Sequence, residues 1–557
     1  MNIHDTYSRW LKLAVKDPDL SEELKAMREE QIEDAFYREV SFGTGGIRGV
    51  IGAGTNRINI YTCAKASQGV SDYLKKTPGE KKVVIAYDSR IKSDLFAKHS
   101  AEVFAANGIH TYLFDRLMPT PVLSYAVRAL GCDAGIVITA SHNPSKYNGY
   151  KVYNAEGCQI TDNAANAIYR EIEKLDFFDD VKEMPYEEAV TEGLIESVPE
   201  TVFTGYIEAV KKESVLGSVP AKRDVRLVFT PLNGTGLEPV TRVLIESGFT
   251  NITVVREQAE PNGSFPTCPK PNPEEAPAME LGLEYCRKYN ADLLLASDPD
   301  ADRLGIAVKK PDGEYVLLSA NELGVLLLDY ICTMRIRNGT MPPHPVFMKT
   351  IVTTELAEKI ADSYGVSTVN TLTGFKYIGE QICELEKKQR EKEFIFGLEE
   401  SYGFLTGTYV RDKDAVNAAL HTAEMFAYLA AKGTGLYERL QELYAIHGYC
   451  LNTQHSYQFE GSAGMERMKE IMEELRSGKY GAAGIPVNAV IDYQRGIDGL
   501  PKSNVLKFLL NHGSMIVRPS GTEPKLKVYC SITADKAEQA EKIEHDLASR
   551  MDAFVKQ

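Results

Sequence analysis

Short apolar runs alternate with segments of helical periodicity over the first part of the chain. Residues 83–88 (VVIAYD) form an apolar run typical of a buried strand, and residues 94–106 carry a helical pattern that stops at Asn107-Gly108. Two further strand-like runs follow, at 111–115 and 135–141. Strands that alternate with helices predict βαβ units, and therefore a parallel sheet covered by helices.

The same alternation begins again twice farther along the chain. After about residue 200, strands are expected at 226–232, 252–257 and 292–297, with a helix near 279–289. After about residue 320, a helix is expected at 321–334 and strands at 346–352 and 394–399. Three α/β units therefore stand in series, alike in architecture but without a clear repeat of residues.

The two ends of the chain differ from this pattern. Residues 1–40 have the composition of an amphipathic helical extension, most clearly over 21–40. Near the other end, a helix at 463–476 precedes two strands, 514–519 and 525–532, joined by a turn, and a final helix is expected over 535–552. Helices that precede and follow a strand–loop–strand unit, instead of alternating with its strands, are typical of an α+β domain.

The predicted fold is therefore of the α/β class, with three consecutive mixed α/β domains whose sheets are covered by helices, followed by a C-terminal α+β domain. A chain of 557 residues is too long for one core, and about three or four domains are expected from its length. We place the four domains at residues 1–200, 201–320, 321–445 and 446–557.

Composition narrows the class of function. The net charge of −15 argues against a nucleic-acid partner, since phosphate backbones require clustered Lys and Arg. No apolar run approaches the ~18 residues that cross a bilayer, and charges near the N-terminus argue against an export signal. Nine scattered cysteines without a C-x-x-C pair predict reduced thiols, and hence a cytoplasmic protein.

The strongest chemical signal is the segment 296–305, ASDPDADRLG. An apolar strand leads into Asp298, Asp300 and Asp302, and alternate residues of an extended backbone point to the same side, so the three carboxylates are expected to converge. An all-oxygen set suits Mg²⁺. An EF-hand is excluded because Arg303 stands where that loop needs glycine and Lys309 where it needs glutamate. A solvated acidic turn is the alternative.

Four other segments carry weaker signals. In 518–525 (RPSGTEPK), Arg518, the hydroxyls of Ser520 and Thr522 and the backbone at Gly521 suit an anion, although a hairpin turn also uses Ser-Gly. The others are a glycine-rich loop ending at Arg48 (42–49), two glutamates and a serine at a strand end (397–403), and Lys376 beside a glycine turn (371–379).

Ser141 stands beside His142 in the segment 139–151, TASHNPSKYNGYK. A Ser-His dyad is not expected, because consecutive side chains of an extended strand point to opposite faces, and the motif G-x-S-x-G is absent. A strand-end serine, a magnesium-type triad and an anion-binding loop instead suit a phosphoryl group carried on serine.

These motifs, in this order, resemble those of the α-D-phosphohexomutase family, which includes phosphoglucomutase and phosphomannomutase. The resemblance extends over nearly the whole chain and rests on GTGGIRG, TASHNP, DPDADR, LEES and RPSGTEP. It implies four domains around a central cleft, each contributing one loop. It also implies a phosphoryl transfer in which one Mg²⁺ per chain assists and a sugar bisphosphate is the intermediate and activator.

The resemblance also assigns roles to residues. Ser141 would be the phosphoserine and would share the Mg²⁺ with Asp298, Asp300 and Asp302. Arg48 and Lys151 would flank the phosphoserine and either stabilise charge or take part in proton transfer. Lys413 resembles a lysine proposed for general acid–base duty, so the three residues are alternatives for handling the substrate's proton. The implied substrate-binding residues are His142, Arg303, Lys376, Glu399, Ser401, Arg518, Ser520, Gly521 and Thr522.

The expected reaction is the interconversion of glucose 1-phosphate and glucose 6-phosphate, with small-molecule sugar phosphates as the partners. Leu398 and Tyr402 depart from a branch of the family that reads G-E-x-S-G-H. The alternatives are therefore a phosphopentomutase, a phosphomannomutase or a glucose 1,6-bisphosphate synthase. A sugar-phosphate-binding regulator is the non-enzymatic alternative. The sequence does not decide between a monomer and a dimer as the oligomeric state.

Overall fold

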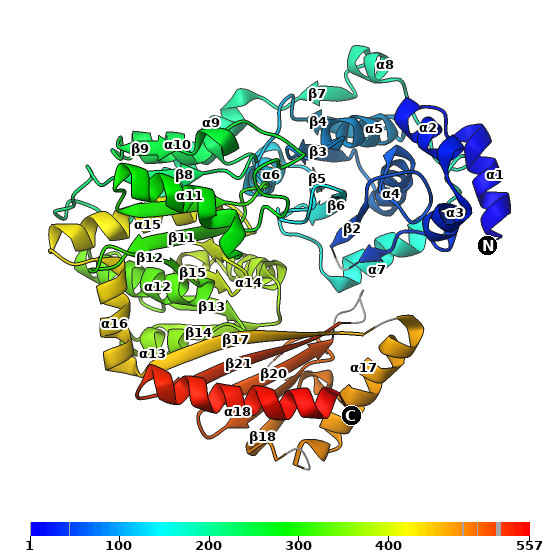
Figure 1. Cartoon of the computed structure of the whole chain (residues 1–557). Coiled ribbons are helices and arrows are strands. Elements are labelled where there is room, and N and C mark those ends of the chain that lie inside the picture. The colour runs from blue at the N-terminus through cyan, green and yellow to red at the C-terminus, as the bar shows by residue number, and fades with distance from the viewer. Residues whose placement is uncertain are drawn as a thin grey trace.

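The computed structural model describes residues 2–43, 45–459, 461–481, 484–497, 499–519 and 525–556, without side chains at 461–463. Four separate sheets follow one another along this part of the chain. In Figure 1 the first three sheets follow an arc from blue through green to yellow-green, and the orange and red C-terminal sheet lies beside the third. The predicted fold class is confirmed.

Three short helices replace the single extension expected at the N-terminus. They are α1 (Ile3–Leu13), α2 (Pro18–Ala26) and α3 (Glu29–Phe36). The buried Trp10 ring makes edge contacts with four aromatic rings, including Phe36 of α3 and Phe177 of the first domain. These contacts bury the apolar face of the extension against the first domain, which holds it in place.

The first sheet has the strand order β1-β2-β6-β5-β3-β4-β7. Its parallel centre was predicted, but three strands at one side are joined by antiparallel pairings: β6 pairs with both β5 and β2, and β2 pairs with β1. The bounds are β1 Phe42–Gly43, β2 Gly46–Val50, β3 Lys82–Tyr87, β4 His110–Leu113, β5 Ala134–Ile138, β6 Tyr147–Asn154 and β7 Ile195–Ser197. The helices are α4 Ile60–Leu74, α5 Ser93–Ala106, α6 Thr120–Leu130, α7 Asp162–Ile172 and α8 Tyr186–Thr191.

The second and third sheets repeat this plan of a parallel centre with antiparallel strands at one side, so the parallel sheet expected from the alternation of strands and helices is found only at the centre of each sheet. Their orders are β12-β11-β10-β8-β9 and β14-β13-β15-β16. The second domain has α9 Glu200–Lys212, β8 Leu227–Thr230, α10 Leu237–Glu246, β9 Ile252–Val254, α11 Ala276–Tyr289, β10 Leu293–Ser297, β11 Leu304–Lys309 and β12 Tyr315–Leu318. The third has α12 Ala320–Arg337, β13 Val346–Thr350, α13 Leu356–Ser363, β14 Ser367–Thr371, α14 Phe375–Lys387, β15 Phe394–Glu399, β16 Gly403–Leu405, α15 Ala415–Ala431 and α16 Leu436–His447.

The fourth sheet is antiparallel throughout, with the order β17-β21-β20-β19-β18. The strands are β17 Tyr449–Gln458, β18 Val487–Asp492, β19 Leu506–Leu510, β20 Gly513–Pro519 and β21 Lys525–Ala534, and the helices are α17 Gly461–Arg476 and α18 Ala537–Val555. Helices α17 and α18 stand before and after the run of strands β18–β21 instead of alternating with single strands, which confirms the predicted α+β character. Short 3₁₀ turns lie at 256–258, 391–393, 479–481 and 493–495.

One apolar core runs continuously through the first three domains, whereas the fourth has a core of its own. A smaller buried cluster joins the third and fourth domains; it includes Ile351 and Tyr377 on one side and Ile516 and Tyr529 on the other. The fourth domain is therefore attached through much less apolar surface than the first three share.

Two expectations from composition can be compared with this fold. No helix among the described residues is long and apolar enough to cross a membrane. All nine cysteines are buried and unpaired, as the scattered spacing predicted.

Candidate active site

Ser141 lies in the turn between β5 and β6, with its backbone in the left-handed region (φ +52°). Its amide donates a hydrogen bond to Oγ1 of Thr139 (2.8 Å), and its side chain is buried. The Ser141 hydroxyl donates to Oδ2 of Asp298 in the second domain over 2.7 Å. The turn therefore directs Oγ across the domain boundary, in a left-handed backbone conformation that is uncommon for residues other than glycine.

The side chain of His142 points towards Ser141, although the sequence predicted that the two side chains would point to opposite faces. Its Nδ1 lies 3.2 Å from the Ser141 Oγ. The prediction was wrong because it assumed an extended strand through residue 141, whereas β5 ends at Ile138 and the positive φ at Ser141 brings the two side chains together. Burial and the charges of Arg303 and Arg48 lower the pKa of His142 well below its usual value, so its ring is neutral.

A buried arginine holds the Ser141 turn, and no sequence motif identified it. The Arg90 guanidinium donates to the carbonyls of Ser141, Asn143, Pro144 (3.0 Å) and Tyr147 (2.9 Å). Asp88 lies beside it, with Oδ2 3.4 Å from Nε. Because a planar guanidinium offers several donors in fixed directions, Arg90 fixes the shape of the turn in a way that lysine cannot reproduce.

The three aspartates converge on one point. Oxygen atoms of Asp298, Asp300 and Asp302 lie within 4.8 Å of one another, and all three residues are buried. The convergence was predicted, but the reason was wrong: β10 ends at Ser297, and a turn with Ala301 at φ +50° gathers the carboxylates. Within this turn, the amides of Asp302 and Arg303 donate to Oδ1 of Asp298 at 3.1 and 3.0 Å.

The electrostatics of the triad suit a cation. Burial and the charges of Asp302 and Asp300 raise the pKa of Asp298 well above its usual value. Burial would also raise the pKa of Asp300, but the neighbouring Lys151 ammonium holds it far below the usual range. Oδ1 of Asp300 and Oδ1 of Asp302 are buried without a hydrogen-bond partner. Unpaired carboxylate oxygens that face one another can hold a divalent metal.

Lysines from two other domains approach the triad. Lys151 on β6 places Nζ 2.8 Å from Oδ2 of Asp300. Lys413 places Nζ 3.2 Å from Oδ2 of Asp302 and 3.8 Å from Oε2 of Glu399. Burial alone would lower the pKa of each lysine, but the neighbouring carboxylates raise both above the usual value, so both remain protonated.

Two arginines add further positive charge near the three aspartates and Ser141. Arg303 forms an ion pair with Glu274, and its Nε lies 3.8 Å from Oδ1 of Asp302. Arg48 on β2 donates to Oδ1 of Asn143 in the Ser141 turn (3.4 Å). The predicted cations therefore surround the serine and the three aspartates.

A cavity of about 240 Å³ opens beside these groups, between the first and third domains. Its lining residues are Gly45, Gln159, Thr373, Gly374, Phe375, Lys376, Glu399, Asp412 and Lys413. Burial raises the pKa of Glu399 to about 7, although Lys413 opposes the shift. The Glu399 Oε2 atom is buried and has no hydrogen-bond partner, which leaves an acceptor for a polar ligand.

The remaining predicted residues divide between this cavity and the fourth domain. Ser401 follows β15 and is partly buried, and Lys376 lines the cavity with Nζ 3.3 Å from Oδ1 of Asp162. Arg518, near the end of β20, pairs in register with Lys527 of β21. Burial, Arg518 and Lys525 lower the pKa of Lys527, which indicates concentrated positive charge there. Ser520, Gly521 and Thr522 lie outside the described residues.

Several residues of the site were not predicted. Thr120 at the start of α6 donates to Oδ2 of Asp300 (2.9 Å), and Tyr153 donates to Oδ2 of Asp412 (2.6 Å). Gln159, Lys527 and Arg90 complete the set. Apart from Arg90, no local pattern reports these residues, because they reach the site through contacts between segments far apart in the chain. Only Arg90, two residues after a buried strand with Asp88 at its end, carried a local signal.

Comparison with known families covers all four domains. Residues 39–179, 204–313 and 319–446 match the families described as phosphoglucomutase/phosphomannomutase, alpha/beta/alpha domains I, II and III. Residues 460–550 match the C-terminal domain of the same description.

Curated relatives and solved structures agree with these matches. A phosphoglucomutase of Staphylococcus saprophyticus is 36% identical over 524 residues, which is 92% of this chain and 94% of the relative. A phosphoglucomutase of Staphylococcus epidermidis is 37% identical over 518 residues, covering 91% and 93%. The solved structure of pp63/parafusin, a phosphoglucomutase from Paramecium in its open form, has a TM-score of 0.70 at 18% identity, covering 93% of this chain and 96% of that one.

Proposed function

Since this chain belongs to the phosphoglucomutase/phosphomannomutase family, we propose that it interconverts glucose 1-phosphate and glucose 6-phosphate through a phosphorylated Ser141 and a sugar bisphosphate. The observation that carries this proposal is the 2.7 Å approach of the Ser141 Oγ to Asp298, within a ring of carboxylates and cations. The curated relatives at 36–37% identity, named phosphoglucomutases, support the choice of glucose phosphates.

Asp298, Asp300 and Asp302 would hold one Mg²⁺, together with an oxygen of the phosphate on Ser141. The unpaired oxygens of Asp300 and Asp302 fit this ion, and three protein ligands suit a metal that also binds phosphate. When bound, Mg²⁺ would offset negative charge on the phosphoryl oxygens. Thr120 orients Asp300 by its hydrogen bond, as expected for a group that surrounds metal ligands.

The cations of this chain stabilise the transferring group. Lys151 and Lys413 are kept protonated by their carboxylate neighbours, and Arg48 and Arg303 are permanently charged. Phosphoryl transfer passes through a loose transition state in which positioning and charge stabilisation dominate. We therefore assign these four residues to charge stabilisation first. Each lysine is also able to donate a proton to the leaving oxygen.

The cavity between the first and third domains would bind the sugar. The Glu399 carboxylate would accept hydrogen bonds from sugar hydroxyls, with Lys376, which also lines the cavity, as a further polar contact. Ser401 and His142 are not among the lining residues, and their proposed contact with the sugar rests on the sequence motifs. Arg518, with Ser520, Gly521 and Thr522, would bind the phosphate that does not react. After the first transfer the bisphosphate turns around, so that its other phosphate returns to Ser141.

Movement of the fourth domain would close the site. That domain joins the third through a small apolar cluster and through polar contacts such as Ser514 with Oε1 of Glu355 (2.7 Å). Interfaces of this size permit domain motion. Closure would bring Arg518 to the substrate and exclude water, which would otherwise hydrolyse the phosphoserine. A cytoplasmic location, with small-molecule sugar phosphates as partners, belongs to the same proposal.

A substrate panel tests the proposed specificity. We expect kcat/KM to be highest for glucose 1-phosphate when glucose, mannose, glucosamine and ribose 1-phosphates are compared with a bisphosphate activator present. A preference for ribose or mannose phosphate would identify the chain as a phosphopentomutase or phosphomannomutase. Accumulation of glucose 1,6-bisphosphate as the end product would identify a bisphosphate synthase.

Arg90→Lys is expected to lower kcat by about 10- to 100-fold while leaving KM nearly unchanged. Lysine keeps the charge near Asp88 but loses the fork of donors that shapes the Ser141 turn, and small displacements of a reacting atom cost rate more than affinity. Steady-state kinetics of the variant would measure the split. Arg116→Lys, at an exposed arginine of the same domain, is the control. An unchanged kcat in Arg90→Lys would contradict the positioning role.

Glu399→Gln is expected to remove a pH dependence of substrate binding. With the Glu399 pKa at about 7, its carboxyl group becomes the charged and stronger acceptor only as the pH rises through neutrality, so KM should fall over that range. The substrate phosphate titrates near pH ~6 in both proteins and so serves as an internal reference. KM profiles of the two proteins that coincide would contradict this role of Glu399.

The same pKa has a consequence for stability. Because the folded protein raises it from 4.5 to about 7, the folded state binds more protons than the unfolded state between these values. The contribution of Glu399 to stability is therefore present below pH 4.5 and is lost as the pH rises towards 7. The variant should lack this loss when unfolding is followed in denaturant at several pH values.

A further inference from the structure

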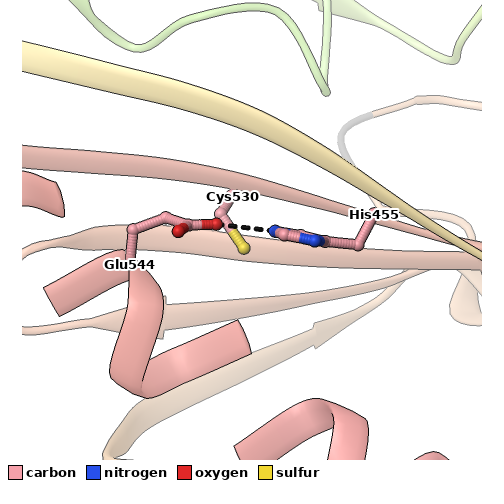
Figure 2. A group of neighbouring side chains, drawn as sticks. All are labelled: His455, Cys530 and Glu544. Atoms are coloured by element: carbon pink, nitrogen blue, oxygen red, sulfur yellow. Dashed lines mark hydrogen bonds and ion pairs between the residues drawn. The ribbon is translucent and has the colours of Figure 1, made fainter. Parts of the chain in front are cut away.

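A second group of metal-binding side chains lies in the fourth domain, apart from the three aspartates. His455 on β17, Cys530 on β21 and Glu544 on α18 place a nitrogen, a sulfur and an oxygen within 4.8 Å of one another. Figure 2 shows the three side chains converging, with a dashed line between His455 and Glu544. The function proposed above makes no use of these residues.

Sheet register explains why the three residues meet. Thr453 of β17 stands opposite Cys530 of β21, so the two side chains share a face of the sheet. His455, two residues farther along β17, shares that face because strand side chains alternate. Helix α18 packs against the same face, since Ala540 and Leu547 belong to one buried cluster with Cys530. Glu544 therefore extends from the helix towards the strand residues.

The distances suit a tetrahedral ion. Ligand atoms around a tetrahedral Zn²⁺ lie about 3.3–3.6 Å apart. Here Nε2 of His455 is 2.6 Å from Oε1 of Glu544, which is closer than two ligands of one ion, so this pair must move apart, whereas the Cys530 sulfur already lies within 4.8 Å of both other ligand groups. Thr453 donates to Oε1 of Glu544 over 2.7 Å and orients the carboxylate, as residues around metal ligands do.

The chemical types of the three ligands and their exposure to solvent narrow the choice of metal ion. A thiol, an imidazole and a carboxylate together favour Zn²⁺ or a similar borderline cation and disfavour Mg²⁺, which takes oxygen ligands. Cys530 is 3% exposed, whereas the side chain of His455 is 32% exposed. Solvent therefore reaches the group from the histidine side and can supply a fourth ligand. The ordinary alternative is a buried thiol beside a surface His–Glu ion pair.

We propose that His455, Cys530 and Glu544 form a Zn²⁺ site that links β17, β21 and α18. Its fourth ligand is water, and the bound ion fastens the C-terminal helix to the sheet that carries Arg518. Binding requires the Cys530 thiol to release its proton to solvent as the sulfur–metal bond forms. No oxidation or reduction is involved.

Cobalt titration tests the proposal in the full chain with Mg²⁺ at saturation. Co²⁺ bound to a thiolate shows charge-transfer absorption in the near ultraviolet, which an all-oxygen site cannot produce. We expect this absorption to saturate at about one Co²⁺ per chain and to disappear when Zn²⁺ is added. Cys530→Ser should abolish it, and Glu544→Gln should weaken Co²⁺ binding by about 10- to 100-fold.

Cys450→Ser is the matched control. Cys450 is buried like Cys530 and lies on β17, next to β21 in the same sheet. Its side chain is on the opposite face of the sheet, 3.5 Å from Oγ1 of Thr354 in the third domain. Its substitution should leave the cobalt spectrum unchanged. Absence of the absorption in the wild-type chain, or its persistence in Cys530→Ser, would overturn the proposal.

Thermal unfolding supplies a second readout and guards against misfolded variants. Zn²⁺ should raise the melting temperature of the wild-type chain and of Cys450→Ser, because an ion that binds only the folded state stabilises it. Glu544→Gln should fold normally in chelator, keep its activity with Mg²⁺ and show a smaller zinc-dependent shift than the wild type at the same Zn²⁺ concentration. An equal shift in Glu544→Gln would contradict the site, whatever the fate of Cys530→Ser.

Discussion

Ser141→Ala is expected to lower kcat for the interconversion of glucose 1-phosphate and glucose 6-phosphate by at least about 10⁴-fold. Without Oγ no phosphoserine forms, and a covalent route cannot be replaced by the charges that remain around it. The hydroxyl is the atom that the turn at Ser141 directs at Asp298. Coupled assays of the purified variant, with a bisphosphate activator in excess, would measure the loss.

The fold should survive this substitution, because Ser141 uses its side chain mainly within the site. Oγ contacts Asp298 and His142, whereas the turn is held through backbone carbonyls by Arg90. Unfolding of Ser141→Ala in denaturant should therefore resemble that of the wild type. Ser145→Ala, in the same turn, is the matched control and should remain active. Substantial turnover by Ser141→Ala would exclude the covalent mechanism.

Asp300→Asn is expected to lower kcat by about 10²- to 10³-fold and to raise at least tenfold the Mg²⁺ concentration that gives half of full activity. The amide keeps an acceptor for Thr120 but removes the charge that faces the cation and Lys151. A chelator should abolish activity of the wild type, and added Mg²⁺ should restore it. Activity measured against Mg²⁺ concentration for both proteins would quantify the shift.

An exposed aspartate of the same domain provides the control. Asp312 pairs with Lys310 over 2.9 Å on a surface turn, so Asp312→Asn should leave both kcat and the Mg²⁺ requirement unchanged. Wild-type activity that persists in chelator, or an Asp300→Asn variant with an unaltered Mg²⁺ requirement, would contradict the metal role of the triad.

The alternation of strands and helices was predictable because the central strands are apolar along their whole length. Residues 394–399 were predicted as a strand, and β15 has these bounds. Strand β6 escaped prediction because it is rich in polar residues, among them Asn148, which is buried and donates to the Ile91 carbonyl (3.1 Å). Only tertiary hydrogen bonds make a strand of that segment, so the antiparallel side of the sheet was missed.

The site was predictable where one short segment carries the chemistry. The three aspartates and Ser141 were predicted as site residues from local motifs, and the structure brings them together, yet the geometry assumed for them was wrong in two places. Positive φ angles at Ser141 and Ala301 replace the extended backbone that we assumed. Arg90 and Thr120 donate hydrogen bonds to residues far away in the sequence, so their contacts exist only in the folded chain.

Proton transfer is the question that the structure sharpens most. The sequence left Lys151, Arg48 and Lys413 as alternatives for managing the substrate proton. The carboxylates around both lysines raise their pKa values, and an arginine does not lose its proton in proteins. All three are therefore cations that can stabilise charge, and the two lysines can also donate a proton. A loose transition state, which needs little help from a base, is consistent with such a site.

The central claim is that Ser141 carries the phosphoryl group during turnover, and mass spectrometry tests it most directly. The intact wild-type chain should be incubated with glucose 1,6-bisphosphate and Mg²⁺, quenched in acid and digested. We predict one phosphate per chain, found on the peptide that contains Ser141, and its transfer to sugar when glucose 6-phosphate is added. A chain that turns over substrate while Ser141 remains unmodified would contradict the account.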